Sequence, residues 1–188
     1  MFNYGEFSEF ECRKLAMKFK DDENYQEAGA IGSVEESMNT KTVTKKYMGV
    51  EKKTRTKGTG AGELKLSLHM NYERYKKTYG MNLDGLEDGV AAYGSNSVHP
   101  EFGIVMETVD EDENVKYKAY PNCVVKDGIA RKIENGGEDV AEIEMTVAVM
   151  PDETGNGMYE ALESKLSQEL KGKWMTEFTP DLVKAKEL

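Results

Sequence analysis

Hydrophobic residues recur at every second position along much of this chain, the spacing of a β-strand with one buried face. The clearest case is residues 63–70, ELKLSLHM, in which three leucines and Met70 alternate with polar residues. Residues 141–149 repeat the pattern, with an apolar face made of Ile143, Met145, Val147 and Val149. Both segments are predicted to be half-buried strands.

Three further segments have strand character. Residues 102–109 and 115–125 flank the acidic sequence DEDEN at 110–114, which predicts a hairpin with an acidic turn. Residues 9–19 also alternate, but their apolar set changes face between Cys12 and Leu15. A β-bulge at that point would restore the buried face.

Two segments instead have helical spacing. In residues 71–80, NYERYKKTYG, Asn71 is a possible N-cap, the tyrosines form a stripe, and Gly80 is a C-terminal stop. In residues 156–170, NGMYEALESKLSQEL, one face would carry Met158, Leu162 and Leu166. Both are predicted to be short amphipathic helices that lie on a sheet.

Regular short strands with few helices predict a mainly β fold. We expect a β-sandwich or small barrel with one or two short flanking helices and a long projecting β-hairpin. At 188 residues the chain is predicted to be a single domain over residues 1–188, with the extended hairpin at about residues 38–63.

The hairpin is predicted from a basic segment in an acidic chain. Residues 41–57 hold seven bases and one acid, which gives this segment a net charge of +6. Because the whole chain has a net charge of −10, the rest of the chain carries −16. One strand over residues 40–57 would span about 60 Å, at about 3.3 Å per residue, whereas a globule of this length is only about 40 Å across. The segment therefore folds back near Gly49 or projects beyond the body. A basic segment on an acidic body is suited to attract something acidic, and a second copy of the chain would qualify.

Phosphate and nucleic-acid binding are both disfavoured. The glycine-rich KGTGAGE at residues 57–63 lacks the Gly-Lys-Ser/Thr of a phosphate loop and precedes a strand rather than a helix, so a turn between strands is preferred. The chain has a pI near 4.9, and its basic segment has one aromatic residue, Tyr47. Two interpretations of the lysines stay open here: a solvated exposed strand, or a strand used in self-association.

No catalytic, metal or cofactor site is predicted, and we expect that the protein is not an enzyme. In DEDEN, Asp110, Asp112 and Asn114 have calcium-loop spacing, but Val115 and Pro121 stand where glycine and glutamate are needed. The two histidines, His69 and His99, make a poor zinc set and have no nucleophile motif beside them.

Cellular location is the last inference from the residues. The two cysteines, Cys12 and Cys123, lie in apolar strand patterns and are predicted to be buried thiols. No stretch approaches the ~18 apolar residues of a membrane span, and no basic-then-apolar signal opens the chain. We expect synthesis in a reducing cytoplasm and no membrane partner.

The major tail protein, or tail tube protein, of long-tailed bacteriophages and prophages of Gram-positive bacteria resembles this chain from about residue 10 to 180. The similarity is one of overall order and segment character, carried by GVEKKTRTKGTGAGELKLSLHMNYERYKKTYGM, DGVAAYG, FGIVMETVDEDENVKYKAYPNCVV and EIEMTVAVMPDETGNGMYEAL. The resemblance implies a structural virion protein whose hexameric rings stack into a hollow tube for DNA passage. By position, residues 41–62 match the family's hairpin toward the adjoining ring.

The resemblance also implies partners: further copies of the chain, a tape measure protein, tail initiator and terminator proteins, and DNA in transient, non-specific passage. The protein would be assembled in the bacterial cytoplasm and end in the phage tail. Alternatives are the inner tube of a contractile tail, tailocin or injection system, another head or tail completion protein, or a small-molecule-binding β-domain. The residues expected at the inter-ring contact are Lys45, Lys46, Lys52, Lys53, Arg55 and Lys57.

Overall fold

The computed structural model of the chain describes residues 7–81, 84–133, 135–136 and 140–185. Within them, strands predominate and two α-helices and two short 3-10 helices complete the fold. In chain order the elements are β1 (Glu11–Phe19), β2 (Gln26–Glu27), β3 (Gly29–Tyr47), β4 (Val50–Met70), α1 (Tyr72–Thr78), β5 (Phe102–Val109), β6 (Val115–Val125), β7 (Ile143–Met150), β8 (Tyr159–Leu162), η1 (Glu163–Lys165), α2 (Gln168–Glu177) and η2 (Pro180–Val183).

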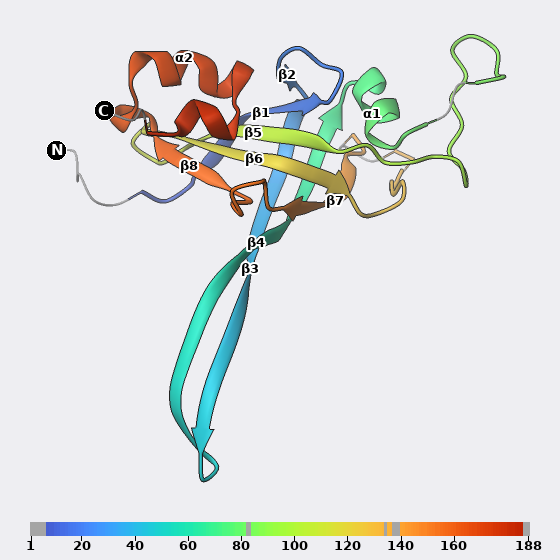
Figure 1. Cartoon of the computed structure of the whole chain (residues 1–188). Helices are drawn as coiled ribbons and strands as arrows, with labels where there is room; N and C mark the ends of the chain where they lie inside the picture. Colours follow the sequence, from blue (N-terminus) through green and yellow to red (C-terminus); the bar gives the residue numbers. More distant parts are fainter. Residues whose placement is uncertain (1–6, 82–83, 134, 137–139, 186–188) are drawn as a thin grey trace.

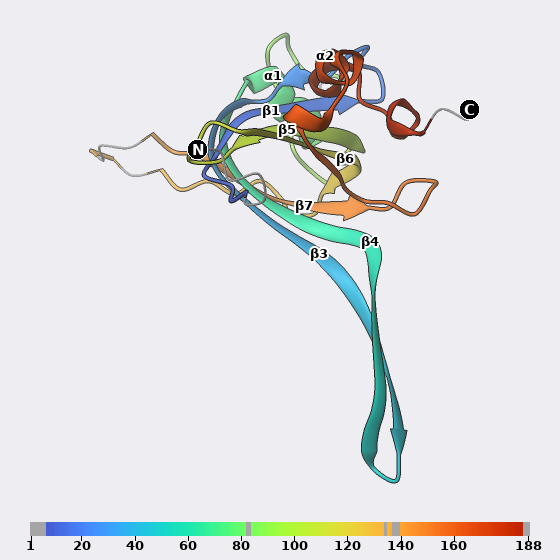
Figure 2. The same cartoon turned by 90° about the vertical axis from the view of Figure 1, so that its left-hand side faces the viewer.

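The strands form one antiparallel sheet in the order β2-β1-β5-β6-β7-β4-β3, with β8 added to β6. The sheet curls until β3 comes into contact with β1 (Figures 1 and 2). At the start of β3 the two sides are joined, because β2 pairs with β1 and is separated from β3 by Ala28 alone, and the N–H of Ala28 extends this pairing to the carbonyl of Leu15 at 2.9 Å. In the described part of the chain no ladder joins β3 itself to β1. The mainly β class with short flanking helices is confirmed, and its form is an incompletely closed barrel rather than a sandwich of two sheets.

The main hydrophobic core fills the inside of this curl. It contains the alternating residues of the strands, among them Leu15, Met17, Phe19, Leu64, Leu66, Leu68, Ile104, Met106, Tyr120, Met145, Val147 and Val149. The predicted inward faces of residues 63–70 and 141–149 are therefore confirmed. Helix α1 adds Tyr75 to the same cluster, and its C-cap residue adds Tyr79.

Several local predictions are confirmed as well. The pairing of β1 with β5 shifts register between Cys12 and Lys14, which is the bulge expected in this strand. Strands β5 and β6 pair as a hairpin around the acidic turn. Helix α1 begins after Asn71, whose side chain accepts the N–H of Glu73 at 2.9 Å, and the chain leaves it at Gly80 with a φ of 55°.

The predicted helix over residues 156–170 is wrong. Residues Tyr159–Leu162 form β8, which pairs with β6 where β7 does not reach, and so fills an otherwise free stretch of that strand. The helix starts later, as α2, where the Ser167 hydroxyl accepts the N–H of Leu170. Trp174 of α2 and Phe178, the residue after the helix, cover the outer face of the sheet over Val105. Tertiary pairing therefore outweighed the helical spacing of this segment.

Candidate interaction surface: the projecting hairpin

The distal halves of β3 and β4 leave the body as a two-stranded hairpin (Figures 1 and 2). Tyr47 pairs with Val50, and the two residues between them, Met48 and Gly49, have φ angles of 50° and 78°. Positive φ at both central positions is the two-residue turn that matches the twist of paired strands. The basic segment thus both folds back near Gly49 and projects beyond the body.

The hairpin has two chemically different faces. On one, Thr42 faces Thr56 and Thr44 faces Thr54, with hydroxyl oxygens 2.9 and 3.2 Å apart. On the other, like charges stand directly opposite each other in the pairs Lys41–Lys57 and Lys45–Lys53, and Arg55 faces Val43. Such like-charged cross-strand pairs destabilise an isolated ladder. The arrangement concentrates positive charge on one face at a cost to the hairpin itself.

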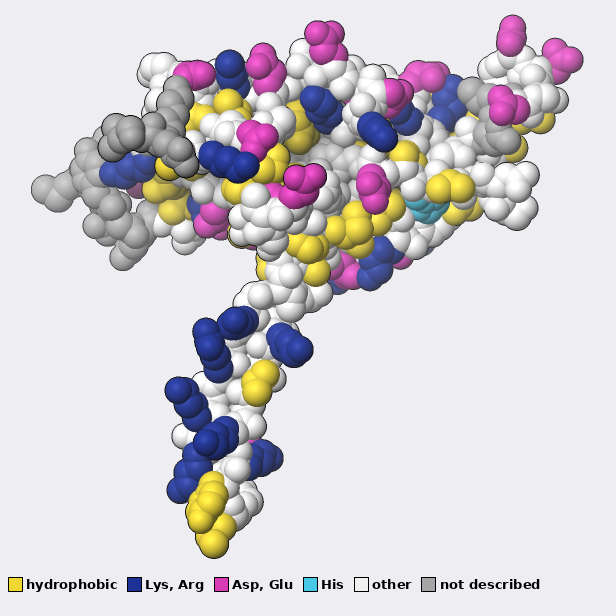
Figure 3. All heavy atoms as spheres, viewed as in Figure 1, with side chains coloured by type: hydrophobic (Ala, Val, Ile, Leu, Met, Phe, Trp, Pro, Cys, Tyr) yellow, Lys and Arg dark blue, Asp and Glu magenta, His cyan; other side chains and the backbone are white. Residues whose placement is uncertain are grey.

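The predicted contact residues are all in this hairpin and nearly all lack a local counter-charge. Lys46 lies 3.7 Å from Glu51, the one acid of the segment. Within the described ranges, no acidic side chain lies within ion-pair distance of the other five: Lys45, Lys52, Lys53, Arg55 and Lys57. Figure 3 shows basic side chains along the stem of the hairpin and acidic ones on the body. Whether these bases contact another subunit stays a prediction.

The end of the hairpin is apolar, a feature that the sequence reasoning missed. Tyr47, Met48 and Val50 are 62%, 86% and 57% exposed, and they form the hydrophobic end visible in Figure 3. We call Tyr47–Val50 the tip. Large apolar side chains at the far end of a charged projection contribute nothing to the subunit's own core. The available signal was the apolar run YMGV inside a basic segment.

The glycine-rich segment anchors the base of the hairpin and is not the expected turn between strands. It lies inside β4, opposite a register shift between Met38 and Thr40, with Gly60 at a φ of 73°. A Cβ at Gly157 would lie 1.8 Å from the carbonyl oxygen of Gly60. The glycines therefore allow a bulge in β4 and a close backbone contact between β4 and the loop after β7. No side chain fits between these two backbone segments.

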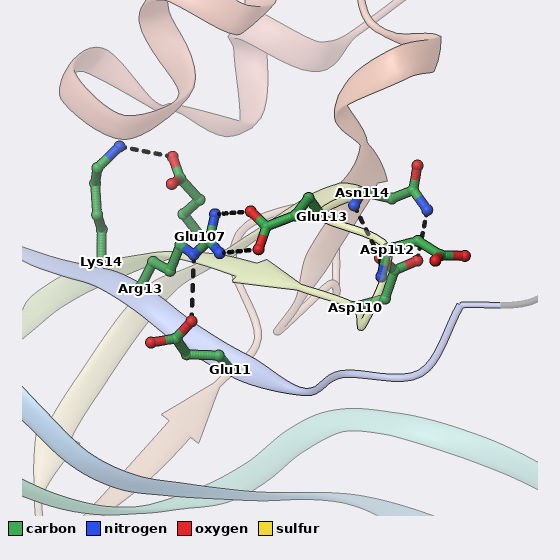
Figure 4. A network of polar contacts seen from close by, with 8 residues as sticks. All are labelled: Glu11, Arg13, Lys14, Glu107, Asp110, Asp112, Glu113 and Asn114. Atoms are coloured by element: carbon green, nitrogen blue, oxygen red, sulfur yellow. Dashed lines mark hydrogen bonds and ion pairs between the residues drawn. The ribbon is translucent and has the colours of Figure 1, made fainter. Parts of the chain in front are cut away.

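The acidic turn between β5 and β6 closes on itself (Figure 4). The carboxylate of Asp110 accepts the N–H groups of Asp112 and Asn114 and the side-chain amide of Asn114 at 2.7–2.9 Å. Burial acts to raise the pKa of Asp110, but these hydrogen bonds outweigh it and the pKa is lowered. Arg13 holds the turn to β1 through Glu113, at 2.6 Å. In the described part of the chain no cluster of three or more metal-binding side chains occurs.

The two histidines and the two cysteines make local contacts or are buried, and do not form a shared site. His99 bonds through Nδ1 to the carbonyl of Val125 at 2.8 Å, and His69 lies 3.8 Å from Glu142 on an exposed face. Both cysteines are free, but Cys12 is only half-buried, whereas Cys123 is buried as predicted. Burial raises the pKa of Cys12 to about 11 and also raises the pKa of Cys123, so both thiols are protonated at neutral pH.

Comparison with known proteins adds little to these observations. No family model matches the chain, and no curated protein sequence matches it. A similar solved structure is the tube-terminating cap of an anti-feeding prophage, determined by cryo-electron microscopy. It is 8% identical, with a TM-score of 0.44, over 86% of this chain and 98% of that one. Among the described residues, neither helix has the length and the apolar run that crossing a bilayer takes.

Proposed function

We propose that the chain is a non-enzymatic subunit of a phage-like tail tube, which assembles as stacked rings around a channel for DNA. The observation that carries the proposal is the projecting hairpin, whose bases other than Lys46 lack counter-charges among the described residues, while the body carries the chain's excess acid. The sequence resemblance to tail tube proteins supports it independently. Contractile-tail tubes and tail completion proteins share this chemistry and are told apart by the tubes they form.

The hairpin provides a contact that repeats. Its basic face and the acidic body of a second copy are different surfaces, so the contact between them is heterologous and leaves one free hairpin and one free body at the ends of every open oligomer. A heterologous contact that does not close on itself generates a filament, and one that closes gives a ring. Electrostatic attraction between the two surfaces would set the register and speed of association more than its strength.

The net charge is suited to a DNA channel. With the hairpins engaged between subunits, the remaining surface carries −16, and a wall of this sign repels phosphate, so DNA passes without binding. The partners we propose are further copies of the chain, a tape measure protein and the proteins that start and end the tube. The place of action is then the virion tail, after assembly in the bacterial cytoplasm.

Negative-stain electron microscopy tests the proposal directly. The purified chain, alone and with a tape measure protein and an initiator complex, should give hollow tubes with a regular axial repeat. Transverse views should show closed rings, which we expect to be hexameric. A protein that stays monomeric in all these conditions would contradict the proposal.

A further inference from the structure

Among the described residues no ladder joins β1 to β3, so the curled sheet leaves an open seam between these strands beyond the β1–β2 pairing that ends at Leu15 and Ala28. A groove of about 490 Å³ occupies this seam. Apolar side chains from three strands line it: Cys12 from β1, Ile31 and Val34 from β3, and Met106 from β5. We call this hollow the seam groove.

The seam groove is acidic, and its lining is mixed: Ser33, Thr108 and charged side chains share it with the apolar ones, and more of its exposed lining is polar than apolar. Glu9, Glu11 and Glu36 line it, and its one base is Lys118. Lys118 is 5% exposed, and its Nζ lies 3.0 Å from Glu9 and 2.9 Å from Glu36, so its charge is already neutralised inside the groove. Burial acts to raise the pKa of Glu9, but hydrogen bonds from Lys116 and Lys118 lower it to about 2. The groove therefore carries a net negative charge at neutral pH.

Both sides of the seam also present free backbone. Within the part of the chain that the structure describes, β3 has a ladder partner on one side only, β4, and β1 between Glu11 and Lys14 is paired only with β5. Unpaired N–H and C=O groups at a sheet edge accept an added strand. The occupant that suits this groove is therefore an extended segment that carries positive charge and has a few apolar side chains for the apolar part of the lining.

The tip of the hairpin has this chemistry. Three exposed apolar side chains stand on a two-stranded end with free outer edges, and Lys45, Lys46, Lys52 and Lys53 flank them. Nucleic acid is a poor alternative for the groove, because its phosphates would meet carboxylates. We propose that the tip, Tyr47–Val50, inserts into the seam groove of a second copy of the chain and is the anchor of their contact. This inference rests on the proposed function and names both halves of its interface.

Apolar anchors in a desolvated groove contribute most of the affinity of such a contact, whereas charges at its rim contribute mainly speed and orientation. Removing the tip side chains should therefore weaken the contact more than removing the bases does. The variant Tyr47→Thr/Met48→Asn/Val50→Thr does so without disturbing the turn, because Asn-Gly is the pair preferred in this turn type and threonine is well tolerated in strands.

Two further variants alter the seam groove and leave the tip unchanged. Val34→Arg places a bulky positive charge in it, and Glu11→Lys reverses a rim charge at a side chain that is 54% exposed, so that the second variant keeps its fold if the first does not. Val98→Arg is the matched control, since Val98 is exposed in a loop outside the seam groove.

Mixing the two kinds of variant gives the decisive measurement. The tip variant keeps an intact groove and a groove variant keeps an intact tip, so each alone should stay monomeric in sedimentation velocity. Their mixture should form one-to-one dimers that cannot grow. Self-association of the tip variant should be at least about 100-fold weaker than that of the native chain, as expected for the loss of an interface anchor. The Val98→Arg control should associate as the native chain does.

The outcomes separate this inference from the proposed function. If the native chain forms tubes but the mixture stays monomeric, the inference is overturned and the proposed function stands. Dimers in the mixture together with a native chain that never forms tubes would support the tip contact and contradict the tube. Unchanged association of the tip variant would also overturn the inference.

Discussion

Reversing three charges of the hairpin tests its role in stacking. The variant Lys52→Glu/Lys53→Glu/Arg55→Glu changes the charge of residues 41–57 from +6 to zero. The hairpin should keep its fold, because Lys53 stands opposite Lys45 and Arg55 opposite Val43. The reversal replaces a like-charged cross-strand pair by an opposite one, an effect of about 0.2–1 kcal/mol in favour of the ladder.

Stacking should respond in the opposite direction. An exposed ion pair contributes about 0.2–1 kcal/mol, and each reversal replaces attraction by repulsion of similar size. Three reversals then amount to about 3 kcal/mol, which is roughly a 100-fold weaker contact. The salt dependence of assembly should also become shallower, because fewer charges of opposite sign meet.

Light scattering and sedimentation as a function of salt would measure the assembly, and thermal unfolding would check the fold. The matched control is Lys20→Glu/Lys165→Glu/Lys173→Glu, which makes the same change of net charge at body positions outside the hairpin. Tubes of normal length and unchanged salt dependence from the hairpin variant would refute the electrostatic argument. An equal loss of assembly in the control would attribute the effect to net charge instead.

Three further predictions concern the subunit alone. Gly157→Ala should lower the free energy of unfolding in urea by about 1–3 kcal/mol, because its Cβ would meet the Gly60 carbonyl, whereas Gly58→Ala, with open space around its Cβ, should have little effect. Burial acts to raise the pKa of Asp22, but hydrogen bonds from Arg74, the Phe19 N–H and Lys77 lower it to about 2. The ionised Asp22 should contribute up to about 2 kcal/mol to the free energy of unfolding, in full above about pH 4 and less as the pH falls toward 2. The difference in stability between the native chain and Asp22→Asn should therefore shrink over that pH range. Trp174→Ala should lower the free energy of unfolding by about 3–5 kcal/mol, because Trp174 is 2% exposed between α2 and the sheet. Chemical unfolding followed by circular dichroism would measure this loss. An unchanged midpoint would show that α2 is not part of the cooperative core.

The strands were predictable wherever one face of the sheet is buried and the other is exposed. Residues 63–70 and 141–149 lie on β4 and β7, which face the core on one side only, so their alternation survives in the sequence. The bulge after Cys12 was predictable for the same reason, since the apolar set had to change phase there. The helix α1 was marked by its caps, Asn71 and Gly80.

The failures have a different cause. The spacing of Met158, Leu162 and Leu166 suits a helix, but whether residues 159–162 pair as a strand depends on a free stretch of β6 that is remote in the sequence. The apolar tip was missed because its residues interrupt the basic segment without any periodicity of their own. Its exposure became visible only when β3 and β4 were placed beyond the body.

The sequence by itself determined the mainly β class, the positions of most strands, and the separation of a basic segment from an acidic chain. These properties are local, because alternation, caps and charge are written in neighbouring residues. Only the tertiary structure decided that the sheet curls into an incompletely closed barrel, that the threonine pairs and the like-charged lysine pairs occupy opposite faces of the hairpin, and that an acidic seam opens between β1 and β3. Those features depend on register and on contacts between distant segments, which no single stretch of the chain specifies.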